Sequence, residues 1–200
     1  LLVRSMSCLI KTLKHKQMNK IKARFWLNQI IGTLLFMVGI FACYYGALQQ
    51  IQWLGITVVS VILLIDLLQN KAQIKRKLKL VILIGFAAAI IESILISTSV
   101  YSVASSSRLL NIHYIVPIWI LALWINFIVR VTSYLIFTRG RHFINALLGA
   151  VFALLIFRSG NKMGLVELHY GMYSLAIVAL AWAVFVPFVY AFANKLFPIH

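Results

Sequence analysis

Apolar residues fill most of this chain in long runs, and short polar connections, most of them basic, separate one run from the next. A helix needs about 20 apolar residues to cross the hydrocarbon core of a bilayer. Because a backbone in lipid has to satisfy its hydrogen bonds within itself, each run is predicted to form a transmembrane helix. The six runs cover residues 27–48, 53–69, 80–100, 114–137, 143–157 and 172–193.

Four of the runs have features that modify this simple picture. The second and fifth are short for a membrane span, so we expect them to tilt little or to begin in the interface. The fourth contains Arg130, and its last residues are therefore expected to extend out of the bilayer. Pro187 lies inside the sixth run and is expected to kink that helix.

The composition places the chain among membrane proteins. Hydrophobic residues make up 63% of it and its mean hydropathy is +0.99, whereas soluble domains are only about half apolar. A net charge of +16 would suggest nucleic-acid binding in a soluble protein. Here the basic residues cluster between apolar runs, so the sequence predicts an all-α, polytopic transmembrane helix bundle with no nucleic-acid partner.

The basic residues also predict the orientation of the bundle, because Lys and Arg accumulate in cytoplasmic loops. If the N-terminus is cytoplasmic, all of the 19 basic residues except Arg108, Arg158 and Lys162 lie on the inner side. We therefore expect a multi-pass protein of the inner membrane with six helices and both termini in the cytoplasm. Tryptophans near the ends of the runs are expected to form interfacial belts, namely Trp26, Trp53, Trp119 and Trp182.

Two regions are expected along the chain. Residues 1–26 form a basic cytoplasmic N-terminal segment, and residues 27–197 form a single transmembrane helical domain. Within the first region, the stretch from Met18 has the pattern of a natural start, a short basic segment followed by an apolar run. Residues 1–17 are then either an upstream extension or a cytoplasmic amphipathic arm.

The sequence carries no signature of a catalytic or metal site. It lacks a Gly-rich phosphate loop and the HExxH, G-x-S-x-G and CxxC motifs. Its two cysteines, Cys8 and Cys43, are predicted on opposite sides of the membrane. They can neither form a disulfide within one chain nor complete a zinc site. Neither a metal nor a cofactor is expected.

Polar residues within the apolar runs are the candidates for a functional site. Asp66 and Arg130 are predicted at matching depths near the inner boundary, so a pair between them is plausible, and the alternative is that both extend to water. Asn28 and Asn126 are predicted in the same inner half, where an amide can join helices through hydrogen bonds.

Glu92 is the most unusual of these residues because it lies in the middle of an apolar run. An ionised carboxylate facing lipid costs at least ~2.5 kcal/mol, so Glu92 is expected to face the bundle. Arg130 is predicted too far along the membrane normal to reach it. We expect a neutral carboxyl group hydrogen-bonded to a hydroxyl, an amide or water, serving either to join helices or as a proton or substrate site.

The connection after the second run is strongly basic and could hold anionic lipid headgroups at the inner leaflet. The alternative is that its charge only enforces topology. Its candidate headgroup contacts are Lys71, Lys75, Arg76, Lys77 and Lys79.

Small residues mark predicted helix-packing surfaces, because they let helices approach closely. They recur at helical spacing on three of the runs: Gly32 and Gly39 on the first, Gly85, Ala88 and Ala89 on the third, and Ala146, Gly149, Ala150 and Ala153 on the fifth.

Four stretches, in their order and spacing, carry a resemblance to a known family. They are "NQIIGTLLFMVGIFACYYGALQQIQWLG" (28–55), "PIWILALWINF" (117–127), "LLGAVFALLIFRSGNKMG" (147–164) and "LAWAVFVPFVY" (180–190). The chain resembles the domain-of-unknown-function 2878 family of small bacterial inner-membrane proteins, over nearly all of residues 28–197. The resemblance implies no established activity. Relatives often neighbour genes for cyclopropane-fatty-acid-synthase-like and oxidoreductase proteins, which implies a link to membrane lipid.

Three function classes follow, in this order. The first is a non-enzymatic membrane component linked to lipid handling or modification, with membrane lipids and lipid-modifying enzymes as its partners. The second is a small transporter or lipid translocator, favoured by the intramembrane polar residues. The third is an intramembrane lipid-modifying enzyme, which would need a ligand cluster that the sequence does not display.

Overall fold

Six α-helices account for nearly all of the described chain, which in this computed structural model comprises residues 2–104, 115–133 and 140–197. A short 3₁₀ turn, η1 (Lys71–Gln73), joins the second and third helices, and two short strands, β1 (Tyr101–Val103) and β2 (Val166–Leu168), form a small ribbon. The helices are α1 (Leu2–Leu48), α2 (Gln52–Gln69), α3 (Ile74–Ser97), α4 (Ile118–Ser133), α5 (His142–Lys162) and α6 (Met172–Leu196).

The transmembrane helix bundle predicted from the sequence is confirmed. Five helical segments within the described residues are long and apolar enough to cross a membrane, and Ile118–Val131 of α4 forms a shorter apolar helix. The outward faces carry large hydrophobic side chains such as Phe86 and Phe188, which are 68% and 66% exposed. Such surfaces are expected where lipid replaces water as the solvent.

The helix boundaries differ in detail from those read from the sequence. α5 continues to Lys162, so it is not one of the short helices, and α6 runs on through Pro187. α1 is continuous from Leu2 to Leu48, so residues 2–26 belong to the same helix as the first apolar run. Residues 134–137 of the fourth run and Arg108 lie outside the described residues.

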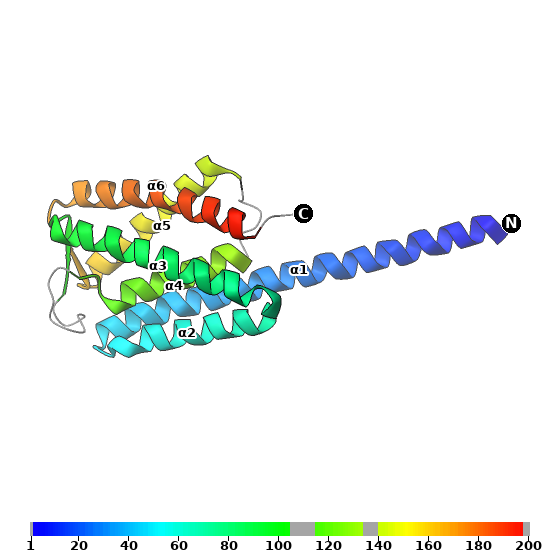
Figure 1. Cartoon of the computed structure of the whole chain (residues 1–200), viewed down its shortest axis with the longest axis horizontal. Helices are drawn as coiled ribbons and strands as arrows, with labels where there is room; N and C mark the ends of the chain where they lie inside the picture. The colour runs from blue at the N-terminus through cyan, green and yellow to red at the C-terminus, as the bar shows by residue number, and fades with distance from the viewer. Residues whose placement is uncertain (1, 105–114, 134–139, 198–200) are drawn as a thin grey trace.

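α4 forms the centre of the bundle. It packs against α1, α2, α3 and α6, while α5 packs mainly along α6 (Figure 1). Because neighbours pack around it, α4 buries most of its described side chains, and Trp124, Ile128 and Val131 are not measurably exposed. Its remaining face, with Ile118, Leu121 and Ile125, is half-buried.

The two ends of the bundle are chemically different. One end, called here the ribbon end, is covered by the antiparallel β1–β2 pair, in which Tyr101 lies opposite Leu168. The other end, called the basic end, holds η1, the C-terminal end of α6 and the point where α1 leaves the bundle as a long helical arm (Figure 1). The ribbon was not predicted, because two three-residue strands leave no periodic signal.

Glycines create the closest helix contacts. A Cβ atom at Gly149 of α5 would lie 2.6 Å from the Trp182 carbonyl oxygen of α6, and one at Gly39 of α1 would lie 2.4 Å from the Asn126 Nδ2 of α4. These two predicted packing positions therefore have a steric basis. Gly85 differs, because a Cβ there would meet no atom within 4 Å. Its assignment to a close helix contact is wrong.

The predicted tryptophan belts are wrong for two of the four residues. Trp26 and Trp53 are 65% and 63% exposed, and their place in an interfacial belt stays a prediction. Trp119 and Trp182, in contrast, are each only 3% exposed and lie inside the bundle. The sequence could not show that these two rings are buried. A position near the end of an apolar run fixes the depth of a residue in the membrane, but not the direction in which its ring points.

The contact at Gly149 gives a first test. We expect Gly149→Ala to destabilise the protein by about 1–3 kcal/mol, because the added methyl group has to push the backbone of α6 away. Gly85→Ala is the matched control and should be neutral or stabilising by up to about 1 kcal/mol, because only helix propensity changes. Unfolding of both variants in detergent micelles measures the difference, and equal stability of the two would contradict the packing described here.

The predicted orientation can be tested by cysteine labelling. In a Cys8→Ser background, Lys75→Cys at the basic end and Met163→Cys after α5 place single exposed thiols at opposite ends, while Cys43 is buried. If the basic end is cytoplasmic, a membrane-impermeant maleimide added to intact cells labels only the Met163→Cys variant. Labelling of the Lys75→Cys variant from outside would show that the basic end faces outward and would contradict the predicted orientation.

Candidate functional site

Glu92 lies in a fully enclosed polar contact near the ribbon end. It is five residues from the end of α3 and has no exposed surface. The Tyr101 hydroxyl of β1 lies 2.7 Å from its Oε2 atom. The indole Nε1–H groups of Trp124 on α4 and Trp182 on α6 both donate to its Oε1 atom at 3.0 Å. One carboxyl group thus joins four elements.

The chemistry of these partners limits where a proton can reside on Glu92. An indole N–H can only donate, so Oε1 acts as an acceptor twice. A proton on Glu92 would have to be on Oε2, where the Tyr101 oxygen can accept it. Burial, and after it the neighbouring Glu92 carboxyl group, raises the pKa of Tyr101 well above its usual value, so the phenol keeps its own proton. The neutral state of Glu92 stays a prediction.

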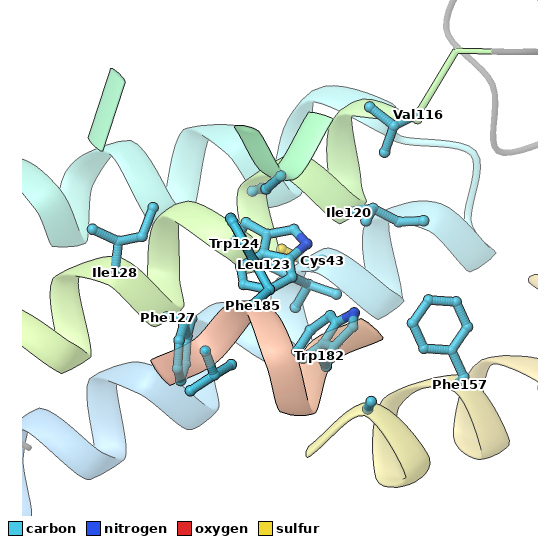
Figure 2. Close-up of a cluster of buried hydrophobic side chains, with 14 of the residues drawn as sticks. Cys43, Val116, Ile120, Leu123, Trp124, Phe127, Ile128, Phe157, Trp182 and Phe185 are labelled. Atoms are coloured by element: carbon cyan, nitrogen blue, oxygen red, sulfur yellow. The ribbon is translucent and has the colours of Figure 1, made fainter. Parts of the chain in front are cut away.

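Aromatic rings enclose this contact. The rings of Trp124 and Trp182 lie 4.2 Å apart between centroids, and Phe185 packs edge-on against Trp124 at 5.1 Å (Figure 2). Phe157 of α5 closes the other side, with its ring 4.8 Å from that of Tyr101. The expectation that Glu92 faces the bundle is met, and its partners are two indoles and a phenol.

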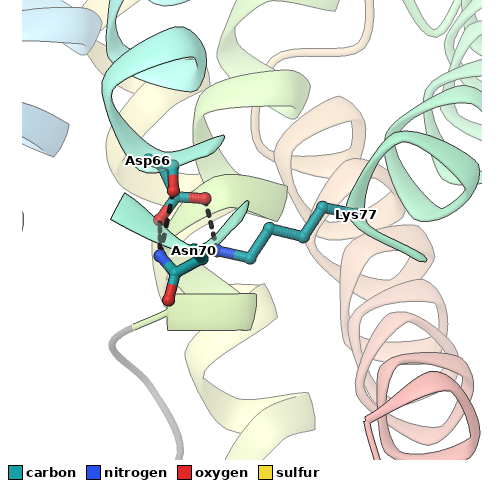
Figure 3. A network of polar contacts seen from close by, with 3 residues as sticks. All are labelled: Asp66, Asn70 and Lys77. Carbon is teal, nitrogen blue, oxygen red and sulfur yellow. Dashed lines mark hydrogen bonds and ion pairs between the residues drawn. The ribbon is translucent and has the colours of Figure 1, made fainter. Parts of the chain in front are cut away.

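Asp66 and Lys77 form a buried ion pair near the basic end. The Nζ atom of Lys77 on α3 lies 2.5 Å from Oδ2 of Asp66 on α2, and both side chains are 3% exposed. The Asn70 amide donates to the Asp66 backbone carbonyl at 2.9 Å and lies 3.4 Å from its Oδ1 (Figure 3). This contact fixes the turn between the two helices.

The structure therefore separates Lys77 from the other basic residues of the connection after α2. Lys77 is buried against Asp66, so its assignment as a lipid-headgroup contact is corrected. It was included only because its sequence neighbours are basic, although its position on α3 turns it towards α2. The other four members of the set are exposed, namely Lys71, Lys75, Arg76 and Lys79.

Arg130 lies at the centre of a second polar cluster at the basic end. Its side chain is 8% exposed, and its Nη2 donates to the Thr33 Oγ1 of α1 at 2.6 Å. Thr33 in turn donates to the Gln29 carbonyl oxygen at 2.8 Å. The Arg130 guanidinium is thus held against α1 by a side chain that is itself fixed to the helix backbone.

Three of the predicted polar residues line a small cavity. It has a volume of about 10 Å³, about the minimum for one water molecule. Asp66, Asn126 and Arg130 line it, together with apolar residues of α1, α2 and α4. The Asn126 amide also donates to the Phe36 carbonyl oxygen at 2.9 Å, and so joins α4 to α1 as expected.

A much larger groove opens on the other side of Arg130. It encloses about 670 Å³, and its described walls are mostly apolar. Apart from Arg130, the described wall residues all belong to one stretch of α1: Phe25, Trp26, Gln29, Ile30, Thr33 and Leu34. Arg130 is the charged group among these described wall residues, so this part of the groove combines a hydrophobic surface with a largely buried cation.

The structure brings together Asp66, Asn126 and Arg130 and places Glu92 apart from them, near the opposite end. Asn28 is exposed on α1, outside the cluster, because the packed face of the helix runs through Gln29 instead. Sequence reasoning missed five participants. Lys77 was read as part of a basic run, Trp182 as a belt residue, and Tyr101, Trp124 and Thr33 gave no signal; these partners become visible only once the helices are packed.

No group of three or more potential metal ligands occurs among the residues that the structure describes. The described wall residues of the groove include no carboxylate, imidazole or thiol. What the arrangement can offer chemically is therefore an apolar surface, a guanidinium and amide or hydroxyl hydrogen bonds.

Apolar helices packed around buried polar contacts define a multi-pass helical membrane protein. Within this class, the chain belongs to the family described as Protein of unknown function (DUF2878), whose model matches residues 29–188. No curated protein and no solved structure matches the chain significantly. The resemblance seen in the sequence is thus confirmed, and the function has to be argued from the site.

The Glu92 contact makes a stability prediction. Glu92→Leu leaves three buried donors without an acceptor and should lower the free energy of unfolding by several kcal/mol, at about 1–3 kcal/mol for each group. Glu92→Gln should cost much less, because its carbonyl oxygen still accepts from both indoles and its amide can donate to Tyr101. Unfolding in mixed micelles, followed by tryptophan fluorescence, compares the two.

Glu167→Gln serves as the control, because Glu167 is the exposed residue of β2, and it should leave stability unchanged. If a Glu92→Gln variant that folds normally fails to restore a deletion phenotype, the carboxyl group has a proton or substrate role. Full restoration would leave Glu92 as a residue that only joins elements.

Proposed function

We propose that this protein is a non-enzymatic component of membrane-lipid handling, which binds a lipid molecule laterally at the basic end of the bundle. The observation that carries the proposal is the groove of about 670 Å³ beside Arg130. Its volume lies within the range of specific small-molecule sites, about 300–1,000 Å³. With the predicted orientation, the groove opens at the inner leaflet of the inner membrane.

The groove wall has the chemistry that an acyl chain requires. Phe25, Trp26, Ile30 and Leu34 are 46–65% exposed and follow one another along α1. In a bilayer these side chains face the hydrocarbon and the headgroup boundary, so a lipid reaches them without crossing water. Trp26 suits the boundary itself, because its ring is apolar and its N–H can still hydrogen-bond.

The proposed function of this protein is to bind a lipid, and it includes no chemical step on that lipid. The described wall offers a hydroxyl from Thr33 and a guanidinium from Arg130, but no side chain that could act as the general base for that hydroxyl. A bound lipid would be held and oriented by this protein, and any modification of it would be carried out by a partner enzyme.

Filling the groove tests this function. Ile30→Trp places a larger side chain in the groove, and we expect the purified protein to lose most of the lipid that stays bound through detergent exchange. Met37→Trp is the matched control, since Met37 lies on the same helix, is 58% exposed and is not part of the groove wall. Native mass spectrometry counts the lipid bound to each variant.

Retention of lipid by the Ile30→Trp variant at the level of the Met37→Trp control would show that lipid covers the whole protein surface without a preferred site. In that case the groove is not where the protein binds lipid, and the proposed function fails.

A further inference from the structure

We propose that the small cavity at the basic end is a binding site for one structural water molecule, which joins the Asp66 carboxylate to the Arg130 guanidinium. The inference goes beyond the proposed function, because it concerns contacts between the helices and holds whether or not a lipid binds along α1. It is carried by the size of the cavity and by the chemistry of the side chains that line it.

The cavity has the size and the polarity that an internal water molecule requires. Its volume of about 10 Å³ is enough for one such molecule. Asp66, Asn126 and Arg130 line it, and all three side chains are buried. Asn126 and Arg130 are one turn apart on α4 and so lie on one face of that helix, while Asp66 belongs to α2. Buried cavities with several polar groups hold water, whereas apolar ones stay dry.

The hydrogen-bonding directions of these groups are complementary to water. A guanidinium can only donate, so Arg130 donates to the water oxygen. A carboxylate only accepts and has about four lone-pair sites, so Asp66 can accept a water O–H in addition to its bond from Lys77. The Asn126 Nδ2 donates to the Phe36 carbonyl oxygen at 2.9 Å, and its Oδ1 can accept the second water O–H. Three hydrogen bonds are typical of a buried water molecule.

The neighbouring contacts show what such a water would connect. Asp66 is paired with Lys77 of α3, and the Nη2 atom of Arg130 donates to Thr33 of α1. With a water between Asp66 and Arg130, one polar chain runs from α3 through α2 and α4 to α1. The basic end would then be joined by a buried polar contact across four elements, as Glu92 joins four elements near the ribbon end.

Nuclear magnetic resonance detects this water directly in the unmodified protein in detergent micelles. We expect magnetisation transfer from water to the side-chain amide protons of Asn126, which lines the cavity. The indole N–H of Trp124 is the internal control and should receive none, because Trp124 is not measurably exposed and donates to Glu92. Absence of transfer to Asn126 overturns the inference. Equal transfer to Trp124 also overturns it, because solvent would then reach the whole interior.

Two cavity-filling variants separate a bound water from signals relayed by exchanging Lys and Arg protons. Val129→Ile and Gly32→Ala each add one methyl group to a residue that lines the cavity and leave every polar side chain in place. We expect them to lose the transfer to Asn126. Val184→Ile is the matched control on the outward face of α6, where Val184 is 56% exposed, and should keep it. Transfer that persists in both filling variants overturns the inference.

A double-mutant cycle tests whether the water connects its two charged neighbours. Asp66→Asn and Arg130→Gln should be non-additive, with a coupling of at least about threefold in the ratio of unfolding equilibrium constants. In the Val129→Ile background the coupling should fall below about twofold. Additive effects in the unmodified background overturn the bridge. Coupling that is unchanged by Val129→Ile also overturns it, because the two charges would then interact without a water between them.

Discussion

The structure depends on one constraint, which is that a polar group inside a bilayer has to find its hydrogen-bond partners within the protein. Glu92 shows this most clearly. Its buried carboxyl group contacts the Tyr101 hydroxyl and accepts from the indoles of Trp124 and Trp182, which come from three other elements. Satisfying one side chain thus fixes the positions of α3, α4, α6 and the ribbon relative to one another.

The same constraint acts differently at the basic end. Asp66 and Asn126 find partners inside the bundle, in Lys77 and in the Phe36 carbonyl group. Arg130 lines both the small cavity that it shares with those residues and the larger groove along α1. Its Nη2 atom is held by the Thr33 hydroxyl of α1, so the guanidinium joins α4 to α1.

The shortage of acidic residues links the whole chain to this site. With only three of them in the sequence, and one already paired at the basic end, the positive charge of that end has few internal partners. Anionic lipid is the most abundant source of negative charge near a membrane surface. The positive charge at this end is the same charge from which the orientation of the bundle is predicted.

The sequence by itself determined the apolar helices and the inward position of Glu92. Helical span and hydropathy are local properties, so the spans could be predicted, and the cost of a carboxylate facing lipid placed Glu92 inside the bundle. The shorter apolar stretch of α4 was not expected, and for Asp66 and Arg130 the sequence left open an internal pair or an extension to water. Only the tertiary structure decided which groups meet. From the sequence, Trp182 was predicted to be a belt residue and Lys77 a headgroup contact. In the structure Trp182 of α6 donates to Glu92 and Lys77 of α3 pairs with Asp66, so both point inward. Partner choice depends on which helix faces oppose each other. The spacing of small residues marked Gly149 as a packing position, but only the tertiary structure showed that it packs against α6.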